Sequence, residues 1–197
     1  MHDDDVALTS YQQAQAVGKA FSSVKVDYIY ASPLLRAWAT AQAVRDAQPD
    51  PQPPFIPNPN LREQHFGIAE GYPYVLDIPE GQTEEDLFAK NIYPVLFSRS
   101  AKYPDGESLD DLARRAEVGI RECVLPHVVE DGVHIIIASH GLCISELVPA
   151  LLRLDPDSPG DVAFTGLMNT AWIRATVSVK VIKRCPQRCW LPTYCVY

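Results

Sequence analysis

The sequence has no apolar run that approaches the ~20 residues needed to span a bilayer. It also has no basic and apolar leader, because it starts with the acidic Met1-His2-Asp3-Asp4-Asp5. The Walker A, Gly-x-Gly-x-x-Gly and Gly-x-Ser-x-Gly signatures are absent. These absences predict a chain with no membrane segment, no nucleotide loop and no serine nucleophile. We expect it in the cytoplasm, with the nucleus as an alternative.

Cysteine and basic charge are both scarce and unevenly placed. Five cysteines in 197 residues are an odd number, which excludes a fully paired disulfide framework. The net charge of −8 argues against a nucleic-acid binder. Residues 162–197 hold no Asp or Glu, and Cys185, Cys189 and Cys195 there lack the spacing of a zinc site. We therefore expect no metal and no cofactor, and we expect neither helix nor strand in residues 185–197.

Helices and strands alternate along the chain. The patterns predict helices over 9–21, 33–47, 83–99, 108–125 and 142–153, and strands over 26–31, 133–139 and within 168–181. The apolar run over 133–139 is typical of a strand buried on both faces of a sheet. The six prolines of residues 49–59 predict a loop. This order predicts an α/β protein with three layers, α/β/α, around a mostly parallel sheet.

Two predicted strand-to-helix junctions carry side chains suited to an anion. Ser32 and Pro33 are expected to start the first of these helices, with Ser32 as its N-cap, and Arg36 follows. His140 stands at the second junction. Helix N-termini favour anions, and an arginine fork can hold two phosphate oxygens. Because parallel strands end at one edge of the sheet, we predict a phosphate site made of Arg36 and His140.

These residues also carry a resemblance. In order along the chain the motifs are Leu8-Thr9 with Gln15-Ala16, Ser32-Pro33-Leu34-Leu35-Arg36-Ala37, Leu61-Arg62-Glu63 with Phe66-Gly67, Pro104-Asp105-Gly106-Glu107-Ser108, and Ser139-His140-Gly141. This series resembles the histidine phosphatase superfamily, the phosphoglycerate mutase-like group, from about Leu8 to Trp172. The resemblance implies a phosphoglycerate mutase-like fold and a small phosphorylated substrate.

The resemblance also implies roles for three residues. Arg36 would clamp the phosphate, and His140 would be the second active-site histidine, which donates to the phosphoryl oxygens. Glu63 would be the general acid that protonates the leaving alkoxide. In this family a phosphohistidine intermediate forms and is then attacked by water or a second hydroxyl, without a metal or other cofactor.

The sequence departs from the family at the nucleophile. The family carries it in an Arg-His-Gly motif after the first strand, and no Arg-His-Gly stands anywhere in this chain. His2 lacks the flanking Arg and Gly and precedes three aspartates. We therefore expect an N-terminally incomplete phosphatase domain over residues 1–176 that lacks its first strand and is inactive or nearly so. Residues 177–197 would form an atypical basic, Cys-rich tail.

Two other interpretations stay open. The chain could be a non-catalytic module that binds a phosphorylated ligand or acts as a scaffold through Arg36 and His140. It could also be a fragment that does not fold alone. Cys143, on an apolar helix, is expected to be a buried small hydrophobic residue rather than a nucleophile. The sequence does not name the substrate, distinguish mutase from phosphatase, or indicate the oligomeric state.

Overall fold

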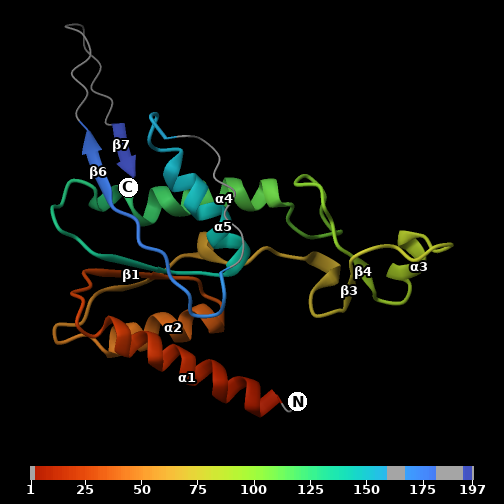
Figure 1. The fold of residues 1–197 in the computed structure, drawn as a ribbon, viewed down its shortest axis with the longest axis horizontal. Helices are drawn as coiled ribbons and strands as arrows, with labels where there is room; N and C mark the ends of the chain where they lie inside the picture. Colours follow the sequence, from red (N-terminus) through yellow and green to blue (C-terminus); the bar gives the residue numbers. More distant parts are fainter. Residues whose placement is uncertain (1–2, 159–166, 181–192, 197) are drawn as a thin grey trace, which may run out of the picture. The chain divides into compact units, whose positions relative to one another are not determined.

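Three parallel strands form the sheet around which the protein is built, seen in a computed structural model that describes residues 3–158, 167–180 and 193–196 (Figure 1). Strand β1 (Tyr28–Ala31) lies between β2 (Phe55–Pro57) and β5 (Ile135–Ala138). In the register of the sheet, Tyr30 of β1 pairs with Ile56 and with Ile137. The predicted α/β class and parallel sheet are therefore confirmed.

The described residues group into two compact units. One unit holds the residues up to 63 and from 115 onward, and the other holds residues 64–114. The three-stranded sheet and the predicted site residues Arg36, Glu63 and His140 all belong to the first unit. The predicted site residues therefore lie within one unit.

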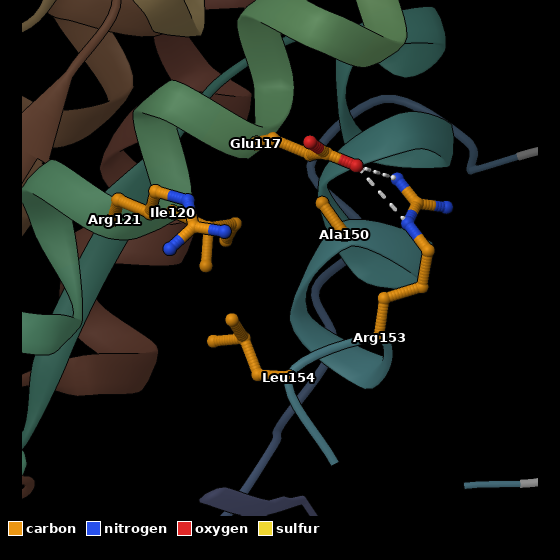
Figure 2. A pocket seen from close by; sticks show the side chains of 6 residues that line it. All are labelled: Glu117, Ile120, Arg121, Ala150, Arg153 and Leu154. Carbon is orange, nitrogen blue, oxygen red and sulfur yellow. Dashed lines mark hydrogen bonds and ion pairs between the residues drawn. The ribbon is translucent and has the colours of Figure 1, made fainter. Parts of the chain in front are cut away.

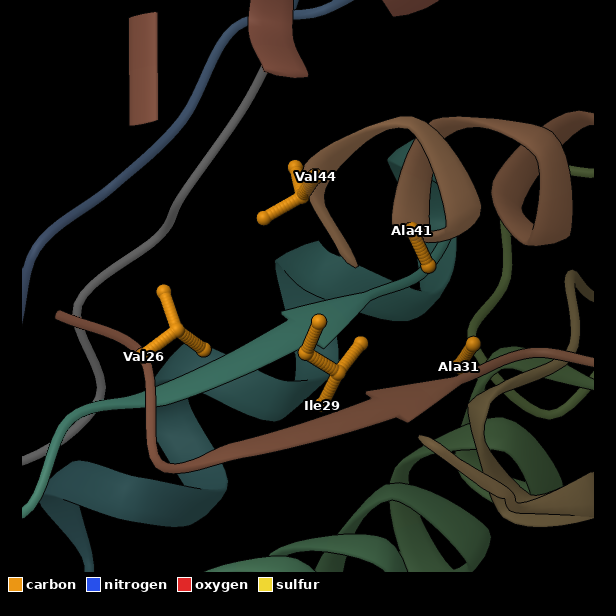
Figure 3. Close-up of a cluster of buried hydrophobic side chains, with 5 residues drawn as sticks. All are labelled: Val26, Ile29, Ala31, Ala41 and Val44. Atoms are coloured by element: carbon orange, nitrogen blue, oxygen red, sulfur yellow. The ribbon is translucent and has the colours of Figure 1, made fainter. Parts of the chain in front are cut away.

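Helices α1 (Asp3–Phe21) and α2 (Leu35–Asp46) cover one face of the sheet (Figure 1). Alternate residues of β1 point to this face, and Ile29 there is fully buried. Burying such a side chain stabilises the fold by about 2 kcal/mol. Figure 3 shows the buried cluster on this face, which consists of Val26, Ile29, Ala31, Ala41 and Val44.

The two helices approach each other closely at Gly18. A Cβ atom added there would lie 2.3 Å from the carbonyl oxygen of Ala43 on α2, so only glycine allows this approach. Helix α1 begins at Asp3, earlier than the predicted start at Thr9. Helix α2 begins at Leu35, which is later than predicted.

The opposite face of the sheet carries α4 (Leu109–Cys123) and α5 (Gly141–Leu152) (Figure 1). Tyr28 and Tyr30 of β1 contact His127, which ends the short 3₁₀ helix η3 (Leu125–His127). Buried side chains of the two helices fill this layer: Ala116, Ile120, Cys123, Cys143, Leu147 and Ala150. Helices on both faces confirm the predicted three-layer arrangement.

Two predictions about the sheet are wrong. Residues 55–57 form β2 within the proline-rich segment that was expected to be a loop. Pro57 is tolerated because β2 is an edge strand, where a missing N–H leaves no gap in the ladder. Strand β5 is half-buried along its whole length, not buried on both faces. Among the described strands it has a neighbour only in β1, so it too is an edge strand.

The second unit is built from short elements. These are the 3₁₀ helix η2 (Gly67–Ala69), strand β3 (Tyr74–Val75), helix α3 (Glu84–Phe88) and strand β4 (Tyr93–Pro94), which pairs with β3 in parallel. The helix predicted over 83–99 is thus only one turn long. It is followed by Asn91, whose φ of 54° is not helical, and then by Pro94. At the start of α4 the backbone N–H groups of Ser108 and Asp111 each donate to the other residue's side chain, which caps the helix reciprocally.

The remaining described strands pair with each other. Strand β6 (Val177–Lys180) pairs antiparallel with β7 (Thr193–Val196). Strand β6 confirms the strand predicted within 168–181, whereas β7 lies in residues 185–197, where the expectation of no strand is wrong. The remaining 3₁₀ helix, η1 (Pro59–Leu61), follows β2. The boundary at residue 176 between domain and tail stays a prediction. No helix among the described residues is both long enough and apolar enough to cross a membrane.

Candidate functional site

His140 lies where β5 ends and α5 begins. It is the N-cap residue of α5, with extended backbone angles (φ −128°, ψ 165°), and its side chain is only 6% exposed. The ring atom Nε2 lies 2.9 Å from the hydroxyl oxygen of Ser32, which follows β1 and is fully buried. Because β1 and β5 are parallel neighbours, their carboxyl ends bring these two residues together.

Ser32 therefore has a different role from the one predicted for it. It was expected to cap a helix beginning at Pro33, but α2 begins at Leu35 and its N-cap, Leu34, makes no side-chain capping bond. The hydroxyl oxygen of Ser32 instead accepts a hydrogen bond from the backbone N–H of Leu34 at 3.2 Å. This bond orients the hydroxyl group that meets His140.

Three charged side chains act on the imidazole of His140. Burial lowers the pKa of His140 below its ordinary value of 6.5. The negative charge of Glu63 opposes this effect, whereas the positive charges of Arg36 and Arg115 lower the pKa further. The ring is therefore neutral at pH 7. The charges of Arg36 and Glu63 thus both act on the His140 ring, although 104 positions separate Arg36 from His140 along the chain.

Arg36 occupies the first turn of α2 and is exposed to solvent. An exposed guanidinium at a helix start remains available to an anion in a way that a buried, fully paired one does not. Its role in holding phosphate stays a prediction.

Glu63 lies against the N-terminus of α5. Its carboxylate oxygens accept hydrogen bonds from the backbone N–H groups of Cys143 at 3.1 Å and Leu142 at 3.4 Å. Amide groups at this position have no partner within the helix and are the groups that bind an anion elsewhere. A carboxylate of the chain itself thus occupies the anion-binding end of α5. The role of Glu63 as a general acid stays a prediction.

Arg115, on α4, is a site residue that the sequence reasoning missed. Its guanidinium donates to the backbone carbonyl oxygens of Asn60 (3.0 Å), Arg62 (2.8 Å) and Glu63 (3.1 Å). One signal was present in the sequence, since Arg115 falls three residues after Leu112 and just before Ala116, on the apolar side of the helix. A cation at such a position needs an internal partner.

Cys123 and Cys143 of the same unit are free, buried thiols. Desolvation raises the pKa of Cys143 to about 11 and that of Cys123 to about 12. Both therefore stay protonated at neutral pH, and only the thiolate is a good nucleophile. The expectation that Cys143 is a buried hydrophobic residue is confirmed, since it is completely inaccessible to solvent.

A pocket elsewhere on the first unit is shown in Figure 2. It has a volume of about 180 Å³, lies between α4 and α5, and is lined by Glu117, Ile120, Arg121, Ala150, Arg153 and Leu154. Arg153 forms an ion pair with Glu117, with 3.0 Å between nitrogen and oxygen. None of Arg36, Glu63 and His140 lines it. Across the described part of the chain, His, Cys, Asp and Glu form no group of three placed to hold a metal. His2 lies outside the described residues.

Residues 2–183 match the sequence profile of the histidine phosphatase superfamily (branch 1). The chain belongs to the histidine phosphatase superfamily. A curated relative, the 2,3-bisphosphoglycerate-dependent phosphoglycerate mutase 2 of Gloeobacter violaceus, is 27% identical over 155 residues, which are 78% of this chain and 68% of the relative. The chain spans about two thirds of the length of the curated relatives it matches.

Solved structures agree with this assignment. The structure described as mycobacterial hydrolase 1 has a TM-score of 0.61 and 22% identity, covering 95% of this chain and 82% of that one. The mycobacterial glucosyl-3-phosphoglycerate phosphatase in complex with VO₃ has a TM-score of 0.56 and 23% identity, covering 86% and 77%. These likenesses show the histidine phosphatase fold and confirm the predicted architecture.

Proposed function

We propose that this histidine phosphatase-family chain binds the phosphoryl group of a small phosphorylated molecule between Arg36 and His140 and does not turn it over by itself. The observation that carries the proposal is that His140, the N-cap residue of α5, has a buried ring whose pKa is lowered by burial and further by the positive charge of Arg36. An exposed guanidinium and a buried neutral imidazole at a helix N-terminus together suit a phosphate oxyanion. The name of the Gloeobacter relative favours a phosphorylated hydroxy acid as the first ligand to test.

The family reaction needs a nucleophile that we do not assign to any described residue. In that reaction a histidine nitrogen forms a bond to phosphorus while the bond from phosphorus to the leaving alkoxide oxygen breaks. An acid protonates the alkoxide, and water then attacks the phosphohistidine to release phosphate. The 197 residues contain no Arg-His-Gly motif to supply the first step.

His140 does not fit the nucleophile's task. Its Nε2 atom already contacts the Ser32 hydroxyl, and the ring is buried. A neutral imidazole carries one N–H donor, which can point to a phosphoryl oxygen and stabilise the charge there. Binding without turnover is therefore the function these side chains support, and a phosphomonoesterase or mutase reaction would require a histidine in addition to them.

Glu63 makes this binding conditional. Its carboxylate sits on the two amides that an incoming phosphate would use. Two anions on one helix end repel each other, so phosphate must displace the carboxylate from these amides.

Binding of orthovanadate and inorganic phosphate, measured by isothermal titration calorimetry, tests the first half of the proposal. Arg36→Ala is expected to weaken binding about tenfold or more, the value of a charge-assisted hydrogen bond. Arg121→Ala is the matched control, because it removes an arginine from a helix of the same unit outside the site. Equal affinities of the two variants would contradict the assignment of Arg36.

Hydrolysis of p-nitrophenyl phosphate and 3-phosphoglycerate tests the second half. We expect no turnover above the buffer rate. Turnover that disappears in His140→Ala would overturn the proposal of inactivity and make the chain a phosphatase. Aggregation or molten behaviour of the purified chain would instead favour a fragment that does not fold alone.

A further inference from the structure

The guanidinium of Arg115 contacts the backbone of one short segment, residues 60–63. It donates to the carbonyl oxygens of Asn60, Arg62 and Glu63 at 2.8 to 3.1 Å. These residues end the 3₁₀ helix η1 and continue in extended conformation, with Arg62 at φ −67° and ψ 157°. Carbonyl groups at such a helix end have no regular partners, so an internal donor is needed.

The segment of residues 60–63 in turn contacts the start of α5. The hydroxyl of Ser139, the residue before His140, donates to the carbonyl oxygen of Leu61 at 2.8 Å. The thiol of Cys143 lies 3.8 Å from the carbonyl oxygen of Asn60. The Glu63 carboxylate binds the first amides of the helix. The segment therefore joins α4 to the end of α5 where His140 stands.

Arginine suits this place better than lysine. A planar fork with five N–H donors can serve several carbonyl oxygens that diverge from one another, whereas a lysine ammonium has three donors at one point. Arg115 is half-buried, and its neighbour Arg114 is exposed and paired with Asp111 one turn earlier on the same helix. The two adjacent arginines thus differ in whether they contact the 60–63 segment.

We propose that Arg115 is a positioning residue: by fixing the backbone of residues 60–63 it sets where the Glu63 carboxylate meets the N-terminus of α5, beside His140. The part of this inference that concerns anion binding rests on the proposed function. The part that concerns the Glu63 contact does not. The two parts are measured separately.

Hydrogen exchange of the Cys143 and Leu142 amides measures the Glu63 contact directly. In Arg115→Lys and Arg115→Ala we expect the Cys143 amide to exchange about tenfold faster, as for loss of a hydrogen bond to a charged group. Arg114→Ala is the matched control and leaves this rate within about twofold, because its side chain does not contact the segment. When Glu63→Gln is also present, the Cys143 exchange rates of the protein with Arg115 and of the Arg115 variants should become nearly equal. The reason is that effects acting through one contact do not add.

Titration of the His140 ring by NMR separates position from charge. Arg115→Ala removes a cation that lowers the pKa of His140, so the midpoint should rise. Arg115→Lys keeps a positive charge, so the midpoint should move less while Cys143 exchange still accelerates. If lysine restored the exchange rate as well, Arg115 would act through its charge alone and the positioning role would be wrong.

The outcomes distinguish the two proposals. Faster Cys143 exchange in the Arg115 variants, with no orthovanadate binding by any form, would sustain the positioning role and overturn the proposed function. Unchanged Cys143 exchange in folded Arg115→Lys would overturn the positioning role, whatever binds. If every Arg115 variant unfolded globally, with Cys143 exchanging at the global unfolding rate, Arg115 would belong to the stability of the fold alone and the inference would fail.

Discussion

Two buried histidines of the first unit, His127 and His140, have similar hydrogen-bond partners but different expected roles. His127 bonds the Tyr30 hydroxyl with Nε2 at 2.9 Å and the Glu130 carboxylate with Nδ1 at 3.2 Å. His140 bonds the Ser32 hydroxyl through Nε2 at 2.9 Å, and no described residue is seen to bond its Nδ1. Each histidine thus meets a hydroxyl group that belongs to or follows β1.

The side chains that surround the two histidine rings differ: an aromatic ring lies against His127, whereas charged groups act on His140. The ring of Tyr28 lies against the ring of His127, with 3.9 Å between the ring centres, which closes that side. His140 faces the charges of Arg36, Arg115 and Glu63 at a helix start. Burial and a hydroxyl partner, which both histidines have, therefore do not distinguish the candidate phosphate-site residue from a structural one. What marks His140 is the convergence of unlike charges at the end of the sheet where helices begin.

Alanine substitution of each histidine is expected to separate stability from binding. His127→Ala removes a packed ring and leaves Tyr30 without its partner, which costs about 3 kcal/mol of unfolding free energy. It should leave the affinity for orthovanadate unchanged. His140→Ala should reduce that affinity about tenfold or more. Urea denaturation and calorimetry on both variants check this, and a loss of affinity in His127→Ala alone would reverse the assignment.

The pH dependence of stability should follow His140. Because its pKa is lowered in the folded protein, the unfolded chain binds more protons below the ordinary value of 6.5. The contribution of this residue to stability is therefore complete above pH 6.5 and falls as the pH drops toward its folded pKa, by at most about 1.4 kcal/mol per pH unit. We would measure the unfolding free energy of the wild type and of His140→Gln between about pH 5 and pH 7.5, which brackets the ordinary histidine pKa. The two sets of values should converge at low pH. Parallel curves would contradict the lowered pKa.

Removing each hydroxyl partner should give the smallest effects. Tyr30→Phe and Ser32→Ala each delete one hydrogen bond to a buried histidine, at about 1 kcal/mol. Tyr30→Phe should change only stability. Ser32→Ala should also weaken orthovanadate binding, because His140 loses the group that orients it. Thermal unfolding and calorimetry test the pair, and equal affinities would show that the ring is oriented without Ser32.

The parts of the fold that depend on neighbouring residues were predictable. The strand within 26–31, the helix within 108–125 and the order of strand then helix at both junctions were all predicted from local residue patterns. The motif series identified the superfamily that the profile match confirms. Strand β2 was missed, because six prolines mask a strand that exists only through its pairing with β1. The exposure of β5 depends on which strands lie beside it, which hydropathy does not report.

The sequence by itself determined the family, the α/β order of the elements and the identity of the candidate residues Arg36, Glu63 and His140. Only the tertiary structure decided that Ser32 meets His140 across 108 positions, that Glu63 lies on the N-terminus of α5, and that Arg115 holds the backbone between them. Propensities and caps act over a few neighbouring residues. These contacts instead arise where parallel strands end side by side, and no local pattern encodes which distant groups will meet there.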